Sequence, residues 1–246
     1  MGLSIVGRRA NNEDALLVRP SLGLFVVADG MGGYEGGEVA SATVVDALAG
    51  FVTKNDVDPE GTWPVRERSD LGPLEMLVEA SLRVADREVK AKKHGVLARM
   101  GSTAVLALFR GTRVVIGHVG DSRVYRLRAG ELAQLTEDHS VAAELAKNGM
   151  GDREVSPAFL ACLTRAIGME GDTVPDVRGE ALFAGDTYLL CSDGLWGALP
   201  EATIAELMRT SALADGCRAL VEAALFAGSS DNITAVLVRA QSGISP

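Results

Sequence analysis

The chain of 246 residues is long enough for one large domain or two small ones, and 47% of its residues are hydrophobic while 23% are charged. This composition is ordinary for a globular protein and excludes a disordered or fibrous chain. The formal net charge of −9 at pH 7 argues against non-specific binding to nucleic acid or to an anionic membrane, because both attract basic surfaces.

Short β-rich runs alternate with longer helical patterns along the chain. Residues 22–28 form an apolar run that predicts a buried strand ending at Asp29, and residues 37–52 and 74–93 carry apolar side chains at helical spacing. Further patterns predict strands at 103–109, 113–119, 122–128, 131–135, 186–191 and 232–239, and helices at 141–148, 203–211 and 216–227. The four strands between 103 and 135 are joined by hairpin-type turns, so they must be antiparallel. An antiparallel core with helices before and after it predicts an α+β layered fold, covered by helices on both faces.

No segment of the sequence is typical of a domain boundary or of targeting. The proline-rich stretch 54–73 separates two helical patterns rather than two composition regimes, so residues 1–246 are predicted to form a single domain. No signal peptide is visible, and the longest apolar runs are far below the ~20 residues that span a bilayer. The three cysteines, Cys162, Cys191 and Cys217, lack paired spacing and are expected to be buried free thiols. These features predict a cytoplasmic protein.

Acidic residues stand at the ends of the predicted strands. Asp29 and Asp193 each close an apolar run and precede glycine, Asp121 lies in a Gly-Asp-Ser turn, and Asp231 precedes the last strand. The pair Glu13 and Asp14 comes just ahead of another short apolar run. Carboxylates at buried strand ends cost desolvation energy unless a partner offsets their charge.

Two interpretations of these carboxylates remain open on spacing alone. Aspartate suits tight turns, where it hydrogen-bonds its own backbone, so each one taken singly is explained by turn chemistry. If the carboxylates converge, the partner they favour is a pair of hard divalent cations with oxygen ligands. A zinc site is disfavoured, because none of the three histidines pairs with a neighbour at ligand spacing.

Eight motifs occur in order across nearly the whole chain: RANNED (9–14), ADGMGG (28–33), GST (101–103), VGDSR (119–123), LTEDHS (135–140), LTRAIG (163–168), CSDGLW (191–196) and DNIT (231–234). On these motifs the sequence resembles the metal-dependent protein phosphatase family, type 2C or PPM, and in particular its compact bacterial members. The resemblance implies a four-layer αββα sandwich, in which two central antiparallel sheets are flanked by helices and the metals lie at one edge.

The resemblance also assigns a role to each acidic position. Asp29 would bridge two Mn²⁺ or Mg²⁺ ions, and the Gly30 carbonyl would be a further ligand. Asp193 and Asp231 would complete the shell of one ion, while Glu13 would hold the other through water.

Three more residues receive roles from the resemblance. Asp14 would act on the metal centre from behind the direct ligands, Arg9 would hold the substrate phosphate, and Asp121 would bind a weaker third cation. A planar guanidinium suits phosphate because it can bond two oxygens at once.

The implied reaction is the hydrolysis of phosphoserine and phosphothreonine in proteins. Two cations about 3.5–4 Å apart lower the pKa of a shared water, and the resulting dimetal-bound hydroxide attacks phosphorus directly. The expected partners are phosphorylated proteins, including a bacterial serine/threonine kinase that this enzyme opposes. Neither nucleic acid nor membrane is expected as a partner, and the protein is expected to be a monomer.

The sequence departs from the family pattern at three positions. Met31 and Tyr34 stand where relatives carry histidines, so the acid that protonates the leaving group is unassigned. Gly197 replaces an aspartate that supports the third cation, which predicts two core ions and weak third-ion binding. By the same resemblance, the segment 148–161 would correspond to the family's flap beside the active site, and it is expected to influence the choice of substrate.

Two other functions stay open at this point. One is a silent relative that binds phosphoproteins without cleaving them, although such a protein would be expected to lose the metal-binding aspartates. The other is a metal-dependent phosphoesterase that acts on small phosphate esters.

Overall fold

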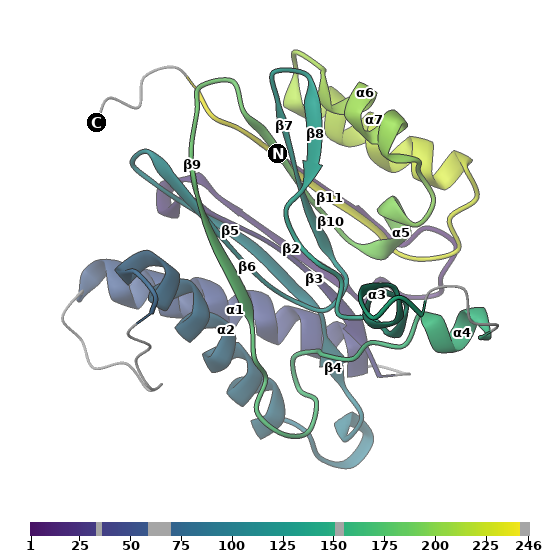
Figure 1. The fold of residues 1–246 in the computed structure, drawn as a ribbon. Helices are drawn as coiled ribbons and strands as arrows, with labels where there is room; N and C mark the ends of the chain where they lie inside the picture. Colours follow the sequence, from purple (N-terminus) through teal and green to yellow (C-terminus); the bar gives the residue numbers. More distant parts are fainter. Residues whose placement is uncertain (33–35, 59–69, 151–154, 242–246) are drawn as a thin grey trace.

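Two antiparallel β-sheets lie face to face in the computed structural model, which describes residues 1–32, 36–58, 70–150 and 155–241 (Figure 1). One sheet has the order β1-β11-β10-β7-β8, and the other has the order β2-β3-β5-β6-β9, with β4 paired to β3. The strands are β1 (Gly2–Ile5), β2 (Asp14–Arg19), β3 (Leu24–Met31), β4 (Gly101–Ser102), β5 (Ala104–Arg110), β6 (Arg113–Val119), β7 (Arg123–Arg128), β8 (Glu131–Gln134), β9 (Asp176–Ala181), β10 (Thr187–Cys191) and β11 (Ile233–Arg239).

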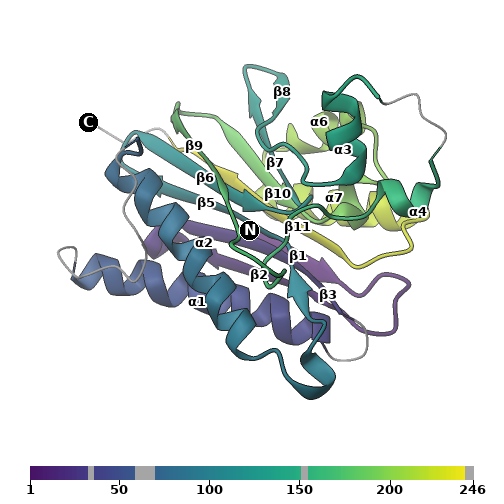
Figure 2. The ribbon, with the colours of Figure 1, turned by 60° about the horizontal axis from the view of Figure 1, so that its bottom comes forward.

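Helices cover the outer face of each sheet. The long helices α1 (Gly36–Val57) and α2 (Pro73–Ala91) pack on the sheet that contains β3, and α6 (Glu201–Met208) and α7 (Leu213–Phe226) pack on the sheet that contains β10. Figure 2 shows the same four layers from another side. The prediction of an α+β four-layer αββα sandwich is therefore confirmed. No helix within the described ranges is long and apolar enough to cross a membrane.

The central strands are buried on both sides, and their side chains alternate between two cores. In β3, Leu24 and Val26 pack against the helices, while Phe25 and Val27 face the opposite sheet. In β10 the same alternation places Tyr188 and Leu190 between the sheets and Leu189 and Cys191 against α6 and α7. This period of two explains why these strands read as continuous apolar runs.

Short helices gather at the end of the sandwich where β3 and β10 finish (Figure 1). They are α3 (Val141–Lys147), α4 (Pro157–Leu160) and α5 (Asp193–Trp196). Elsewhere in the chain, 3-10 turns occupy Pro20–Leu22, before β3, and Gly95–Leu97, before β4. Ser140 caps α3 by accepting a hydrogen bond from the amide of Ala143.

The structure corrects several sequence predictions. The strand predicted at 22–28 starts at Leu24, after a turn in which Gly23 has φ of 54°, and it continues through Asp29 to Met31. The strands β1, β2 and β9 were not predicted. All three are edge strands of their sheets, and most of their residues are only partly buried, so their sequences show no clear strand pattern. Of the proline-rich stretch 54–73, residues 54–57 belong to α1, Pro73 begins α2, and residues 59–69 lie outside the described ranges. The prediction of buried cysteines is wrong for Cys162, which is exposed.

Candidate metal centre

The pairing of β2 with β3 places two acidic side chains opposite each other. Asp14, the first residue of β2, is the register partner of Asp29 near the end of β3. Glu13 precedes them, and its carbonyl accepts a hydrogen bond from the Gly30 amide at 3.1 Å. The Glu13 amide in turn donates to the Asn232 side chain at 2.9 Å, which ties this corner to the opposite sheet.

The other sheet contributes Asp193 and Asp231. Asp193 opens α5 directly after β10, and Asp231 precedes β11, the antiparallel partner of β10. The two segments approach so closely that a Cβ on Gly194 would lie 2.0 Å from the Asn232 carbonyl oxygen. Glycine at 194 is therefore a steric requirement of this corner, which explains the Asp-Gly sequence that follows the strand.

The carboxylates repel one another in a poorly solvated space. Burial raises the pKa of Asp29 well above its usual value, and the charges of Asp14, Asp193 and Asp121 raise it further. The pKa of Asp193 is likewise raised, first by burial and then by Asp231. We call Asp14, Asp29, Asp121 and Asp193 the carboxylate cluster.

Asp14 is the most enclosed member of the carboxylate cluster, at 9% exposed. Its Oδ2 atom accepts hydrogen bonds from Ser192 at 2.8 Å and from Thr234 at 2.6 Å. Burial nevertheless raises its pKa to about 6, against the opposing effect of these two bonds. The hydroxyls of Ser192 and Thr234 fix the orientation of the carboxylate.

Asp121 reaches the carboxylate cluster from the turn between β6 and β7. Burial, followed by the charge of Asp193, raises the pKa of Asp121 to about 7. Its carbonyl accepts a hydrogen bond from the Trp196 indole at 3.0 Å. Asp121 and Asp193 both line a groove of about 1000 Å³ that extends to α3 and α4.

Glu13 and Arg9 lie at the rim of the carboxylate cluster. Burial raises the pKa of Glu13, although the charge of Arg9 partly opposes that rise. Arg9 is half exposed, and its guanidinium pairs with Asp231 at 2.6 Å and donates to the Ser230 carbonyl at 3.3 Å. The guanidinium therefore lies beside the carboxylates on the solvent side, where an incoming anion would meet it.

The donor set fits hard divalent cations. Within the described ranges, the Oδ1 atoms of Asp14 and Asp193 are buried without a hydrogen-bond partner, an arrangement that costs free energy unless a cation or water satisfies them. Bound divalent cations would offset the burial and the mutual repulsion that together raise the pKa values of Asp29 and Asp193. Only carboxylate and carbonyl oxygens are offered here, which disfavours soft metals.

The structure places the acidic residues predicted for the metal site, together with Arg9 and Gly30, at this end of the sandwich. Tyr34 lies outside the described ranges, as do residues 151–154 of the segment predicted to be a flap. Gly197 follows α5 and lines a second, 370 Å³ hollow together with Asp193 and Asp231. The supporting hydrogen bonds of Ser192 and Thr234 were not predicted from the sequence. The available signal was their closeness in sequence to site aspartates, since Ser192 precedes Asp193 and Thr234 follows Asp231 by three residues.

The family assignment comes from comparison with known proteins. A family model described as Protein phosphatase 2C matches residues 1–224. The chain belongs to the protein phosphatase 2C family. In this member of the family, the carboxylates of the cluster come from the strand ends of both sheets.

Individual relatives agree with this assignment. The chain is 37% identical over 231 residues to the serine/threonine protein phosphatase PstP of Mycobacterium tuberculosis, an alignment that covers 93% of this chain and 42% of that protein. This chain therefore spans less than half the length of that relative. It is 34% identical over 220 residues to the serine/threonine phosphatase stp of Listeria innocua, covering 87% of this chain and 83% of that one. The crystal structure of the PstP catalytic domain in complex with 2 manganese ions superposes with a TM-score of 0.76 at 35% identity, covering 96% of this chain and 95% of that one.

Replacing Arg9 tests the rim of the site. If Arg9 holds the substrate phosphate, as the family resemblance implies, Arg9→Ala should lower kcat/KM for a phosphothreonine peptide by about ten- to a hundredfold, because a charge-assisted hydrogen-bond donor is lost. The kcat/KM of Arg9→Lys should lie between those of the wild type and Arg9→Ala, because lysine keeps the charge but lacks the planar guanidinium. Steady-state kinetics at fixed Mn²⁺ measures the effect, with Arg8→Ala as the control at an exposed neighbouring arginine. Equal losses in the Arg8 and Arg9 variants would contradict a specific role for Arg9.

Proposed function

We propose that the chain is a divalent-cation-dependent phosphatase that hydrolyses phosphoserine and phosphothreonine in proteins. The observation that carries this proposal is the carboxylate cluster, whose mutual repulsion and orphaned oxygens call for bound cations. Membership of the protein phosphatase 2C family supports the same reaction. We further propose that residues 1–246 act as one catalytic domain.

The cations would be two Mn²⁺ or Mg²⁺ ions, as the two manganese ions of the PstP catalytic domain suggest. Asp29, which couples to carboxylates from both sheets, would lie between them. Asp193 and Asp231 would hold one ion, while Glu13 and the Gly30 carbonyl would hold the other.

Two further aspartates would have lesser parts in cation binding. Asp14, whose carboxylate is held by the hydroxyls of Ser192 and Thr234, would support the metal centre from behind the direct ligands. A third cation at Asp121 would bind weakly, because Gly197 brings no carboxylate to that side.

When bound, the two cations would supply Lewis-acid activation of water and would neutralise charge on the phosphoryl oxygens. The protein residues would do the rest. Arg9 would orient the phosphate, and the carboxylates would fix the position of the cations relative to it. No nucleophilic side chain is invoked: Cys191 is fully buried, and burial raises its pKa far above the usual range of a thiol.

The groove beside Asp121 and Asp193 offers room for the polypeptide around the phosphorylated residue. A groove of this size favours a phosphoprotein over a small phosphate ester as the substrate. The expected partner is a serine/threonine kinase that this enzyme opposes. A monomer suffices, because every carboxylate of the site comes from one chain. The three free cysteines are consistent with a reducing compartment, so we propose a cytoplasmic location.

Phosphate release from a phosphothreonine peptide tests the proposal. We expect release that requires Mn²⁺, stops with EDTA and is lost in Asp193→Ala. p-Nitrophenyl phosphate serves as the comparison substrate. Hydrolysis of that ester without release from any phosphopeptide would favour a small-ester phosphoesterase. Binding of phosphopeptide without hydrolysis would favour a silent relative.

A further inference from the structure

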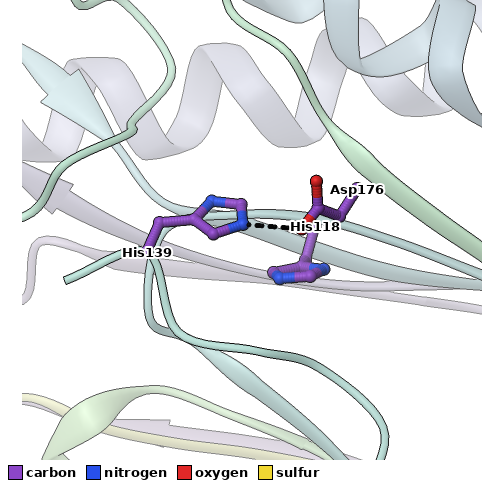
Figure 3. Close-up of side chains that lie close together, drawn as sticks. All are labelled: His118, His139 and Asp176. Carbon is purple, nitrogen blue, oxygen red and sulfur yellow. Dashed lines mark hydrogen bonds and ion pairs between the residues drawn. The ribbon is translucent and has the colours of Figure 1, made fainter. Parts of the chain in front are cut away.

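Two histidines and an aspartate that are far apart in sequence meet beside the carboxylate cluster. His118 lies on β6, His139 lies just before α3 and Asp176 begins β9, and Figure 3 shows their side chains together. One nitrogen or oxygen atom from each residue lies within 4.8 Å of the others. Both histidines are buried, at 5% and 1% exposed.

These three side chains have the composition of a transition-metal site, but their geometry indicates hydrogen bonding instead. Both nitrogens of His139 are engaged, because Nδ1 accepts from the Gly120 amide at 3.0 Å and Nε2 lies 3.1 Å from Asp176. Nε2 of His118 lies 2.8 Å from the Glu137 carbonyl oxygen. The two rings are stacked at 28° with centroids 4.6 Å apart, so their in-plane lone pairs do not converge on one ion.

The two contacts of His139 specify one tautomer. Because the Gly120 N–H points at Nδ1, that nitrogen must be unprotonated, and the ring proton must lie on Nε2. There it is donated to Asp176, whose pKa is held well below its usual range first by this hydrogen bond and then by Arg165. The ionised Asp176 therefore favours the tautomer that can accept from Gly120.

His139 holds Gly120 at two points. Besides the ring contact, the His139 amide donates to the Gly120 carbonyl at 2.9 Å. Gly120 has φ of 106°, and a Cβ there would lie 2.6 Å from Thr103, so the turn depends on glycine and on these two bonds. The next residue is Asp121, a member of the carboxylate cluster.

The contacts of His139 and Asp176 extend to the segment 162–176. Arg165 donates to Asp176 at 2.8 and 3.3 Å, and the Thr164 amide donates to the His139 carbonyl at 2.8 Å. Two bonds join Ile167 to Ser102, whose hydroxyl donates to the Asp29 carbonyl at 3.0 Å. The segment is thus linked to both the Asp121 turn and the end of β3.

We propose that His139 is a positioning residue whose tautomer, set by Asp176 and Arg165, holds the Gly120 turn and so presents Asp121 to the carboxylate cluster. In this arrangement Asp176 acts through His139, and His139 acts through the Gly120 amide; none of them contacts substrate. The consequence for cation binding rests on the proposed function, whereas the tautomer and the Gly120 contact do not.

Nitrogen NMR and amide exchange test the positioning role directly, in Mg²⁺-containing buffer. In the wild type we expect a protonated Nε2 and an unprotonated Nδ1 for His139, together with a protected Gly120 amide. Asp176→Asn removes the charge that selects the tautomer, so Gly120 should exchange about 5- to 10-fold faster, as the loss of one hydrogen bond implies. Asp172→Asn, an exposed residue of the same segment, is the matched control and should behave as the wild type.

Two variants of His139 separate the ring acceptor from simple packing. Asparagine places its side-chain oxygen near the position of Nδ1, while glutamine places its amide near Nε2. We therefore expect His139→Asn to keep Gly120 protected and His139→Gln to lose that protection. Equal exchange in both variants, or an Nδ1-protonated ring in the wild type, would overturn the proposal.

Phosphate release as a function of Mn²⁺ tests the link to cation binding. Asp176→Asn should raise the Mn²⁺ concentration at half-maximal rate by about fivefold, and by more than it lowers the maximal rate. An unchanged Mn²⁺ dependence with faster Gly120 exchange would contradict the link to the carboxylate cluster. If the wild type releases no phosphate, the proposed function fails, while the NMR and exchange results still decide the positioning role.

Discussion

Asp29→Asn is expected to lower kcat for a phosphothreonine peptide by about a thousandfold or more, because a neutral amide cannot bridge two cations. The substitution keeps the size of the side chain, and it removes the charge that burial and three neighbouring carboxylates disfavour. The metal-free variant should therefore be at least as stable as the metal-free wild type. Steady-state kinetics and thermal unfolding of the same preparations measure both effects.

The matched control for this substitution is Asp46→Asn, on an exposed position of α1. It makes the same chemical change away from the carboxylate cluster and should leave both properties unchanged. An Asp29→Asn protein that keeps more than about a tenth of the wild-type kcat would contradict the bridging role.

Metal-free protein should lose stability as the pH rises, which is the opposite of the usual effect of a paired carboxylate. Asp14 and Asp121 have pKa values raised to about 6 and about 7 in the folded state, from 3.8. Between the unfolded and folded values the folded state binds more protons, so raising the pH from about 4 to about 7 lowers the free energy of unfolding. The shift of Asp14 alone corresponds to a loss on the order of 3 kcal/mol, or roughly 6 to 12 °C in melting temperature, and Asp121, which is partly exposed, adds to this loss.

Mn²⁺ should reverse this trend, because cations bind the deprotonated carboxylates. At a hundred times the dissociation constant each site adds about 2.7 kcal/mol, so the difference in melting temperature between the Mn²⁺ and EDTA samples should widen from pH 5 to pH 8. Asp14→Asn should flatten the decline of the metal-free protein. A difference that narrows as the pH rises would show that these carboxylates do not bind the metal.

The sequence predicts the frame of the fold because its central strands are buried on both sides. The apolar runs that became β3, β5, β6 and β10 leave little alternative to a layered core, and their hairpin turns require antiparallel pairing. The edge strands β1 and β9 were missed for the complementary reason. Their residues are only partly buried, so pairing with a neighbouring strand, rather than their own pattern, makes them strands.

The acidic residues of the site could be selected from sequence, but their environment could not. Asp29 and Asp193 were marked by their position between an apolar run and a glycine. That Asp14 is opposite Asp29 depends on the register of β2 and β3, which no local pattern specifies. The meeting of His118, His139 and Asp176 likewise depends on tertiary pairing, since β9 was not predicted and the residues are 21 or more positions apart.

The stoichiometry of Mn²⁺ bound at equilibrium tests the central claim most directly. The carboxylate cluster, together with Glu13 and Asp231, should hold two ions per chain. Asp193→Ala should bind fewer than two, and Asp46→Asn should bind two as the wild type does. A wild type that binds no stoichiometric Mn²⁺, yet releases phosphate from a phosphothreonine peptide in EDTA, would contradict the account.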